Sequence, residues 1–184
     1  MPTYRNSKNY HDSQEALIFS LDELEFNKIN KILENYEYHL YIKLHPLEES
    51  QFKFKNNYSN IHMLSEDIIS EHYGTLYKFL GTTSGLITDY SSVFLDYYLL
   101  NRPVAFTIND YEEYKENRGF VFDDVKSLMA GPTISNLDEL LKFLLSVMKS
   151  EDEFCVERNK VNSLVNSIQR DFTKTLLESI RIEK

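Results

Sequence analysis

The sequence alternates short apolar runs with longer segments whose apolar residues recur at helical spacing. The apolar or β-branched runs predict strands at 38–44, 61–64, 86–88 and 103–107. Apolar residues that return every three or four positions predict helices over 24–36, 76–80, 93–101, 136–149, 151–168 and 171–182. Polar residues over 109–117 predict a loop or a short helix. This alternation predicts one α/β domain over 1–184, in which helices flank a parallel sheet and 133–184 is mainly helical.

Capping signals mark two of the predicted helix starts. Ser20 and Glu23 have the S-x-x-E spacing of a capping box before the first long helix. Asn136 and Glu139 occupy the corresponding positions before the helix over 136–149. We therefore expect both helices to begin close to these residues.

The stretch from Leu86 to Ser92 joins a predicted buried strand to a predicted helix. Thr88 closes the strand, Asp89 is the expected N-cap, and Ser91 and Ser92 fall in the expected first helical turn. Backbone N–H groups in a first turn lack helical partners, so they and the two hydroxyls favour a phosphate group. An ordinary capped strand–turn–helix explains the same pattern, and such caps are common.

The composition is that of a soluble globular protein, with 184 residues, 42% hydrophobic and 27% charged. A net charge of −9 argues against non-specific binding to nucleic acid, which requires a positive surface. The single cysteine, Cys155, cannot form an internal disulfide, which fits a cytoplasmic protein. Because no apolar run is long enough to span a bilayer, we expect any membrane contact to be peripheral.

Cofactor and metal motifs are absent from the sequence. It contains no Walker A motif, no G-x-G-x-x-G and no histidine–cysteine spacing typical of zinc sites. We therefore expect no cofactor.

Several polar residues follow the predicted strands, where ligands of parallel α/β sheets bind. His45 can donate a hydrogen bond to a phosphate oxygen, although a surface histidine before a turn is equally consistent. Arg118 with Gly119 pairs a fixed cation with a residue that allows close backbone approach, and Arg5 can contact a phosphate similarly. Each arginine in isolation is better explained as a solvated or ion-paired side chain.

Three acidic residues and two tyrosines have simpler structural explanations. Asp123 and its neighbour Asp124 can bind a ligand hydroxyl or pair with a lysine, but a solvated turn explains them better. Asp96 is expected on a helix surface, and Tyr97 and Tyr98 are expected to pack in the core.

Taken together, these motifs resemble the CDP-glycerol glycerophosphotransferases, the teichoic-acid polymerases and primases of bacteria. The resemblance is strong over 1–132 and weak over the helical tail. Its motifs, in chain order, are Met1-Pro2-Thr3-Tyr4-Arg5, Lys43-Leu44-His45-Pro46, Ile87-Thr88-Asp89-Tyr90-Ser91-Ser92, Asp96, Arg102-Pro103, Tyr114, Arg118-Gly119-Phe120, Asp123 and Gly131-Pro132.

The resemblance implies a fold and a set of roles. The family has a GT-B-type architecture of two Rossmann-like halves, and this chain resembles the C-terminal half, which holds the CDP-activated donor. The acceptor polymer and its catalytic base would belong to an N-terminal half that this sequence lacks. His45 would stabilise the pyrophosphate, and the implied substrate-binding residues are Arg5, Thr88, Asp89, Ser91, Ser92, Arg118, Gly119 and Asp123.

The expected activity is transfer of glycerol phosphate, or a related polyol phosphate, from CDP-glycerol to a cell-surface polymer, with release of CMP. We expect this at the cytoplasmic face of the membrane, and we expect this chain alone to be inactive. Two alternatives remain open: half of a nucleotide-sugar-dependent GT-B glycosyltransferase, and a non-catalytic binding domain.

Overall fold

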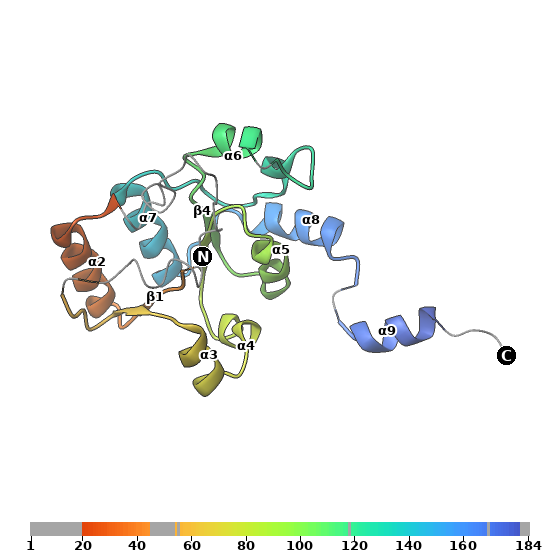
Figure 1. Ribbon diagram of the computed structural model, residues 1–184, viewed down its shortest axis with the longest axis horizontal. Coiled ribbons are helices and arrows are strands. Elements are labelled where there is room, and N and C mark those ends of the chain that lie inside the picture. The colour runs from red at the N-terminus through yellow and green to blue at the C-terminus, as the bar shows by residue number, and fades with distance from the viewer. Residues whose placement is uncertain (1–19, 45–53, 55, 118, 169, 181–184) are drawn as a thin grey trace.

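The structure is a computed structural model that describes residues 20–44, 54, 56–117, 119–168 and 170–180 (Figure 1). The strands in these ranges are β1 (Leu40–Ile42), β2 (Ile61–Met63), β3 (Leu86–Thr88) and β4 (Val104–Phe106). The α-helices are α2 (Glu23–Asn35), α3 (Glu66–His72), α4 (Leu76–Leu80), α5 (Val93–Tyr97), α6 (Tyr111–Asn117), α7 (Leu137–Met148), α8 (Cys155–Val165) and α9 (Phe172–Ser179). Two 3-10 helices are η2 (Tyr98–Leu100) and η3 (Val125–Leu128).

The strands form two parallel pairs, β1 with β2 and β3 with β4. Leu40 lies opposite Ile61 in the first pair, and Leu86 lies opposite Val104 in the second. A parallel bridge from Phe106 to the segment around 133 extends the second pair. The α/β class and the parallel pairing are confirmed, whereas the single sheet that we expected is divided into two pairs within the described ranges.

Helices cover both faces of the strands, and each face has its own core. One cluster joins α2 and α7 to both strand pairs and contains Phe26, Ile29, Leu33, Ile42, Ile61, Ala105, Leu140 and Phe143. The other face packs α5, η2 and α8 against the second pair and contains Leu86, Phe94, Tyr97, Tyr98, Val104, Phe106 and Val161. The packing role predicted for Tyr97 and Tyr98 is confirmed, because their exposed fractions are 2% and 0%.

The helix starts agree with the capping signals in one case and differ in the other. Asn136 caps α7 by accepting a hydrogen bond from the Glu139 N–H at 3.0 Å, as predicted. The capping box of α2 is formed by Asp22 and Glu25, each accepting the other's backbone N–H at 2.8 Å. The prediction of Ser20 as the cap was wrong, because the D-x-x-E spacing two residues later makes the same reciprocal bonds.

Beyond α6 and η3, the described part of the chain is helical and consists of α7, α8 and α9. The predicted helix over 151–168 is shorter in the structure, and the next helix is separate from it. In Figure 1, α9 projects away from the other helices. Phe172, Leu176 and Ile180 of this segment are each more than half exposed.

Candidate functional site

The loop of residues 89–92 leaves the carboxyl end of β3, which is where ligands of parallel α/β folds bind. Thr88 and Asp89 are each only 1% exposed. The Asp89 carboxylate accepts a hydrogen bond from the Ser91 N–H at 3.2 Å, two residues along the chain. Asp89 therefore stabilises the turn itself, and our prediction that it caps the helix was wrong.

The α-helix after this loop begins at Val93, later than an N-cap at Asp89 implies, and ends at Tyr97, before the predicted end at residue 101. Ser92 is the N-cap residue of α5 and makes no side-chain capping bond, so Ser91 and Ser92 precede the first turn. The helix α5 has five residues and is followed directly by the 3-10 helix η2. The residue after η2, Asn101, has a left-handed backbone conformation with φ of 48°. Since so short a helix has little macrodipole, a phosphate here would depend on the loop's own N–H and O–H groups.

The two serine side chains are accessible. Ser91 is half-buried and Ser92 is exposed. Among the described residues, neither hydroxyl takes part in a hydrogen bond. Both hydroxyls can therefore donate to an anionic ligand at this edge of the fold.

An aromatic cluster of Tyr90, Tyr111, Tyr114 and Phe120 joins this loop to α6 and the segment after it. The Tyr90 ring lies 4.2 Å from the Tyr114 ring and 5.4 Å from the Phe120 ring, measured between centroids. Phe120 also stacks on Tyr111 and Tyr114, at 5.2 Å from each. The Tyr90 hydroxyl donates to Asp110 at 2.8 Å. The cluster therefore holds residues 119–120 beside the loop of residues 89–92.

Gly119 ends α6 in a conformation that favours glycine. Its φ is +71°, and its N–H donates to the Tyr114 carbonyl at 3.3 Å. A side chain here would be strained in the left-handed region. Arg118 itself lies outside the described residues, as do His45 and Arg5, so the structure does not test the roles predicted for these three residues.

Lys43 is a buried cation that belongs to the Lys43-Leu44-His45-Pro46 motif but for which the sequence predicted no role. It follows β1, is 6% exposed, and its Nζ lies 2.7 Å from Oε1 of Glu66. The same Nζ donates to the Leu44 carbonyl at 3.3 Å. A lysine inside the apolar run 40–44 was the available signal, since a buried ammonium group requires a partner.

The remaining acidic candidates have different surroundings. Asp123 is exposed. Asp124 caps η3 by accepting the Ser127 N–H at 3.2 Å. Asp96 accepts the Tyr77 hydroxyl at 2.8 Å, and this hydrogen bond is the main cause of the raised pKa of Tyr77. Asp96 is on the helix surface, as expected.

The described part of the chain shows neither a metal-binding cluster nor a membrane-spanning helix. Its histidine, cysteine, aspartate and glutamate side chains form no group of three that could hold a metal ion. None of its helices is both long and apolar enough to cross a bilayer.

Known proteins resemble this chain in sequence and in fold. The model of the CDP-Glycerol:Poly(glycerophosphate) glycerophosphotransferase family matches residues 1–172. A teichoic acid poly(ribitol-phosphate) polymerase of Bacillus spizizenii is 29% identical over 150 residues, which are 82% of this chain and 22% of that protein. A teichoic acid glycerol-phosphate primase of Bacillus subtilis is 31% identical over 142 residues, 76% of this chain and 32% of that protein.

The solved structure of the wall teichoic acid polymerase TagF is also similar. It superposes with a TM-score of 0.62 at 23% identity, over 98% of this chain and 44% of that one. A variant of TagF soaked with CDPG superposes equally well. At this identity the likeness establishes the fold, and the chain spans less than half the length of each relative named here. The match to the family model over 1–172 shows that the chain belongs to the CDP-glycerol:poly(glycerophosphate) glycerophosphotransferase family.

Proposed function

We propose that this chain is the donor-binding part of a glycerophosphotransferase that uses CDP-glycerol or a related CDP-polyol. Membership of the family supports the reaction class. The observation that carries the site is the loop of residues 89–92, whose two accessible hydroxyls lie at the carboxyl end of β3. The aromatic cluster supports the inclusion of Gly119, because it fixes the neighbouring Phe120 against Tyr90.

The proposed chemistry is displacement at phosphorus. An acceptor hydroxyl attacks the β-phosphorus of the donor, the bond from that phosphorus to the bridging oxygen breaks, and CMP leaves. The hydroxyl proton passes to a base on the acceptor side. Ser91, Ser92 and loop N–H groups hold the donor's oxygens, while His45, Arg118 and Arg5 offset the pyrophosphate charge. Such catalysis depends on positioning and charge stabilisation.

The coverage of the relatives supports the proposal that this chain is one part of a larger enzyme. The chain corresponds to 44% of TagF. We assign it to the C-terminal, Rossmann-like half of a GT-B-type enzyme, with the acceptor polymer on the other half. Acting on a CDP-activated donor, the complete enzyme would work at the cytoplasmic face of the membrane, with peripheral contact to it.

Calorimetric titration of CDP, UDP and GDP into the 184-residue chain tests donor binding. CDP should bind best, and the Ser91→Ala, Ser92→Ala double variant should weaken it by about 1–3 kcal/mol, the scale of lost hydrogen bonds to a charged group. The control is Ser70→Ala, an exposed serine on α3. Unchanged CDP affinity in the double variant would remove the serines from the site. Preference for UDP or GDP would favour a nucleotide-sugar enzyme, and no binding would favour a non-catalytic domain.

The absence of turnover by this chain alone is a separate expectation. General-base assistance contributes about 10²–10⁴-fold to such reactions, and holding an acceptor in line contributes more. A chain that lacks both should bind donor without transferring it. CMP release from CDP-glycerol, measured with a glycerol-phosphate-primed acceptor, checks this. Acceptor-dependent release that disappears in His45→Ala would place the base on this half instead.

A further inference from the structure

A polar cavity, here called the Lys126 pocket, lies beside the bridge that joins β4 to the segment around residue 133. It measures about 560 Å³. Phe106 and Ile108 give it an apolar part, and its polar lining residues are Asn109, Lys126, Thr133 and Ser135. All four polar residues are exposed, so a ligand can reach them from solvent.

The Lys126 pocket lies at the same edge of the strands as the loop of residues 89–92. The Thr107 N–H donates to the Thr88 carbonyl at 2.9 Å, and the Ile134 N–H donates to the Phe106 carbonyl at 2.8 Å. These bonds place β4 between β3 and the segment around residue 133. Because the loop and Asn109 follow the carboxyl ends of neighbouring parallel strands, the pocket adjoins the edge where ligands of such folds bind.

The ammonium group of Lys126 is held by an aromatic ring. Its Nζ lies 3.6 Å from the centroid of the Tyr111 ring. The Tyr111 ring is in turn 6.3 Å from that of Tyr90, which belongs to the loop of residues 89–92. A cation–π contact restricts where the ammonium group lies but leaves its positive charge available to an anion.

Carboxylates are absent from the lining of this pocket. The described residues that line it include no aspartate or glutamate. Asp110 follows Asn109, but its carboxylate accepts the Tyr90 hydroxyl at 2.8 Å. Glu139 accepts the Ser135 N–H at 2.6 Å and lines a different cavity. A lysine without an acidic neighbour in the lining favours an anionic ligand, in a chain whose net charge is −9.

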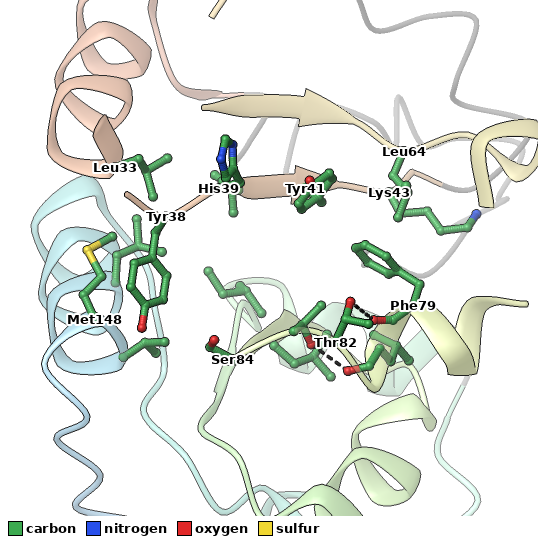
Figure 2. Close-up of a pocket in the computed structure, with 18 of the residues that line it drawn as sticks. Leu33, Tyr38, His39, Tyr41, Lys43, Leu64, Phe79, Thr82, Ser84 and Met148 are labelled. Atoms are coloured by element: carbon green, nitrogen blue, oxygen red, sulfur yellow. Dashed lines mark hydrogen bonds between the residues drawn. The ribbon is translucent and has the colours of Figure 1, made fainter. Parts of the chain in front are cut away.

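In two other cavities, carboxylates accompany the lysines. Figure 2 shows the cavity between β1 and β3, where Lys43 is ion-paired with Glu66 at 2.7 Å. A further cavity, between α7 and residues 151–154, is lined by two lysines and four carboxylates. The Lys126 pocket differs from both in carrying a positive charge that its own lining does not neutralise.

The remaining polar groups of the pocket suit a ligand that also carries hydroxyl or ester oxygens. Among the described residues, the side chains of Asn109, Thr133 and Ser135 make no hydrogen bond. Their amide and hydroxyl groups can each donate to an oxygen and accept from a hydroxyl. The apolar surface of Phe106 and Ile108 can contact a short carbon chain. A phosphate joined to a polyol combines all of these features.

We propose that the Lys126 pocket binds a polyol phosphate unit of the acceptor polymer, separately from the donor diphosphate at the loop of residues 89–92. Lys126 pairs with the phosphodiester, and Asn109, Thr133 and Ser135 bind the polyol oxygens. The proposal rests on the proposed transferase function for the identity of this polymer. This half of the enzyme then contacts the acceptor as well as the donor, and it holds one unit of the polymer beside the reacting phosphate.

Calorimetric titration of a synthetic glycerol phosphate trimer into the 184-residue chain tests the pocket. Lys126→Met should weaken trimer binding by about tenfold or more, the loss expected for a hydrogen bond to a charged group. Lys126→Arg keeps the charge and should restore the affinity. The control Lys160→Met removes an exposed lysine of α8, changes the net charge equally, and should leave the affinity within about twofold. Unchanged trimer affinity in Lys126→Met, with the fold verified by circular dichroism, would overturn the proposal.

Titration with CDP separates this pocket from the proposed donor site. Lys126→Met should leave CDP affinity within about twofold, because the diphosphate is assigned to the loop. Displacement of the trimer by CDP would overturn the proposal by placing Lys126 in the donor site, and so would loss of trimer binding in the Ser91→Ala, Ser92→Ala double variant. A chain that binds the trimer but not CDP would contradict the proposed donor-binding function and leave this pocket standing.

Inorganic phosphate separates a polyol phosphate site from a general anion site. Thr133→Val removes one hydroxyl and should weaken trimer binding by about threefold while leaving phosphate affinity unchanged. Equal affinities for inorganic phosphate and the trimer would overturn the proposal, since the site would then recognise charge alone. Absence of trimer binding to the unsubstituted chain would overturn it as well.

Discussion

The Tyr98 hydroxyl provides a sharp test of how the loop after β4 is held. Tyr98 is fully buried in η2, and its hydroxyl donates to the Leu128 carbonyl and accepts from the Ala130 N–H, both at 2.8 Å. Its ring packs at 5.5 Å from that of Phe94. Replacement by phenylalanine removes one oxygen atom, retains the ring and leaves both backbone groups without this partner.

The size of the effect follows from those two groups. The Ala130 N–H also donates to the Leu128 carbonyl at 3.2 Å, so each group keeps one longer bond when the hydroxyl is removed. Two lost buried hydrogen bonds of about 1–1.5 kcal/mol each lead us to expect that Tyr98→Phe lowers the free energy of unfolding by about 2–3 kcal/mol. In a domain of this size each kcal/mol corresponds to about 2–4 °C, so Tm should fall by roughly 4–12 °C. Burial raises the pKa of Tyr98, so the phenol is neutral at pH 7 and the loss involves no charge.

The adjacent tyrosine supplies the control. Tyr97 is 2% exposed, and its hydroxyl lies 2.8 Å from the Thr83 hydroxyl, but that hydroxyl also donates to the Leu80 carbonyl at 2.9 Å. The Tyr97 hydroxyl also donates to the Thr83 carbonyl at 3.3 Å, and Arg102 Nη1 donates to the same carbonyl. Tyr97→Phe therefore leaves its partners satisfied and should cost about 1 kcal/mol. Urea denaturation followed by circular dichroism measures the free energy of unfolding of both variants, which are compared at equal m-values. Equal losses for the two variants would refute the argument that the two backbone bonds of the Tyr98 hydroxyl determine the cost.

Three further perturbations test separate parts of the fold. Asp152→Asn removes the ionic partner of Arg158, whose side chain is 0% exposed, and should lower the free energy of unfolding by about 3 kcal/mol in urea denaturation. The control Glu151→Gln should lower it by under about 0.5 kcal/mol. Gly131→Ala places a Cβ 1.9 Å from the Val104 carbonyl oxygen and should lower the free energy of unfolding by about 2 kcal/mol or more. The control Gly81→Ala, at the end of α4, should lower it by under about 1 kcal/mol. Burial and the neighbouring His39 lower the pKa of His62 below 6.5, so below that pH the unfolded chain binds more protons. The free energy of unfolding should therefore fall as pH decreases from 6.5, and a pH series should show this fall reduced in His62→Gln.

Local signals in the sequence were sufficient for the elements whose ends are fixed by near neighbours. The start of α7 depends on Asn136 and Glu139, three residues apart, and it was predicted correctly. The strands were predicted from apolar runs, and all three residues of β4 are indeed buried, whereas Tyr41 of β1 is exposed. Each strand is nonetheless only three residues long, since a strand ends where pairing ends, and pairing is not visible in a single run.

Long-range contacts account for what the sequence could not predict. Arg158 lies in α8 and has the appearance of an ordinary helix-surface arginine, yet its Nε donates to Asn101 Oδ1 at 3.2 Å, across 57 residues of sequence. Asn101 follows η2 directly and has a left-handed backbone conformation. The helix predicted over 93–101 therefore ends at a residue that is held by a hydrogen bond from the distant Arg158. No periodicity of the chain contains that information.

The charges of the described residues around the loop of residues 89–92 indicate what else a diphosphate site there would need. Asp89 belongs to the loop of residues 89–92 and Asp110 accepts the Tyr90 hydroxyl, so the described groups there include two carboxylates. The Lys126 Nζ lies over the Tyr111 ring, 3.6 Å from its centroid, rather than over the loop. A pyrophosphate carries several negative charges, and hydroxyls and N–H groups cannot neutralise them beside carboxylates. The donor binding that we propose at this loop would therefore need further positively charged or hydrogen-bond-donating side chains, and the candidates from the sequence are His45, Arg118 and Arg5. The loop would fix the position of the diphosphate, and these cations would supply most of its electrostatic stabilisation.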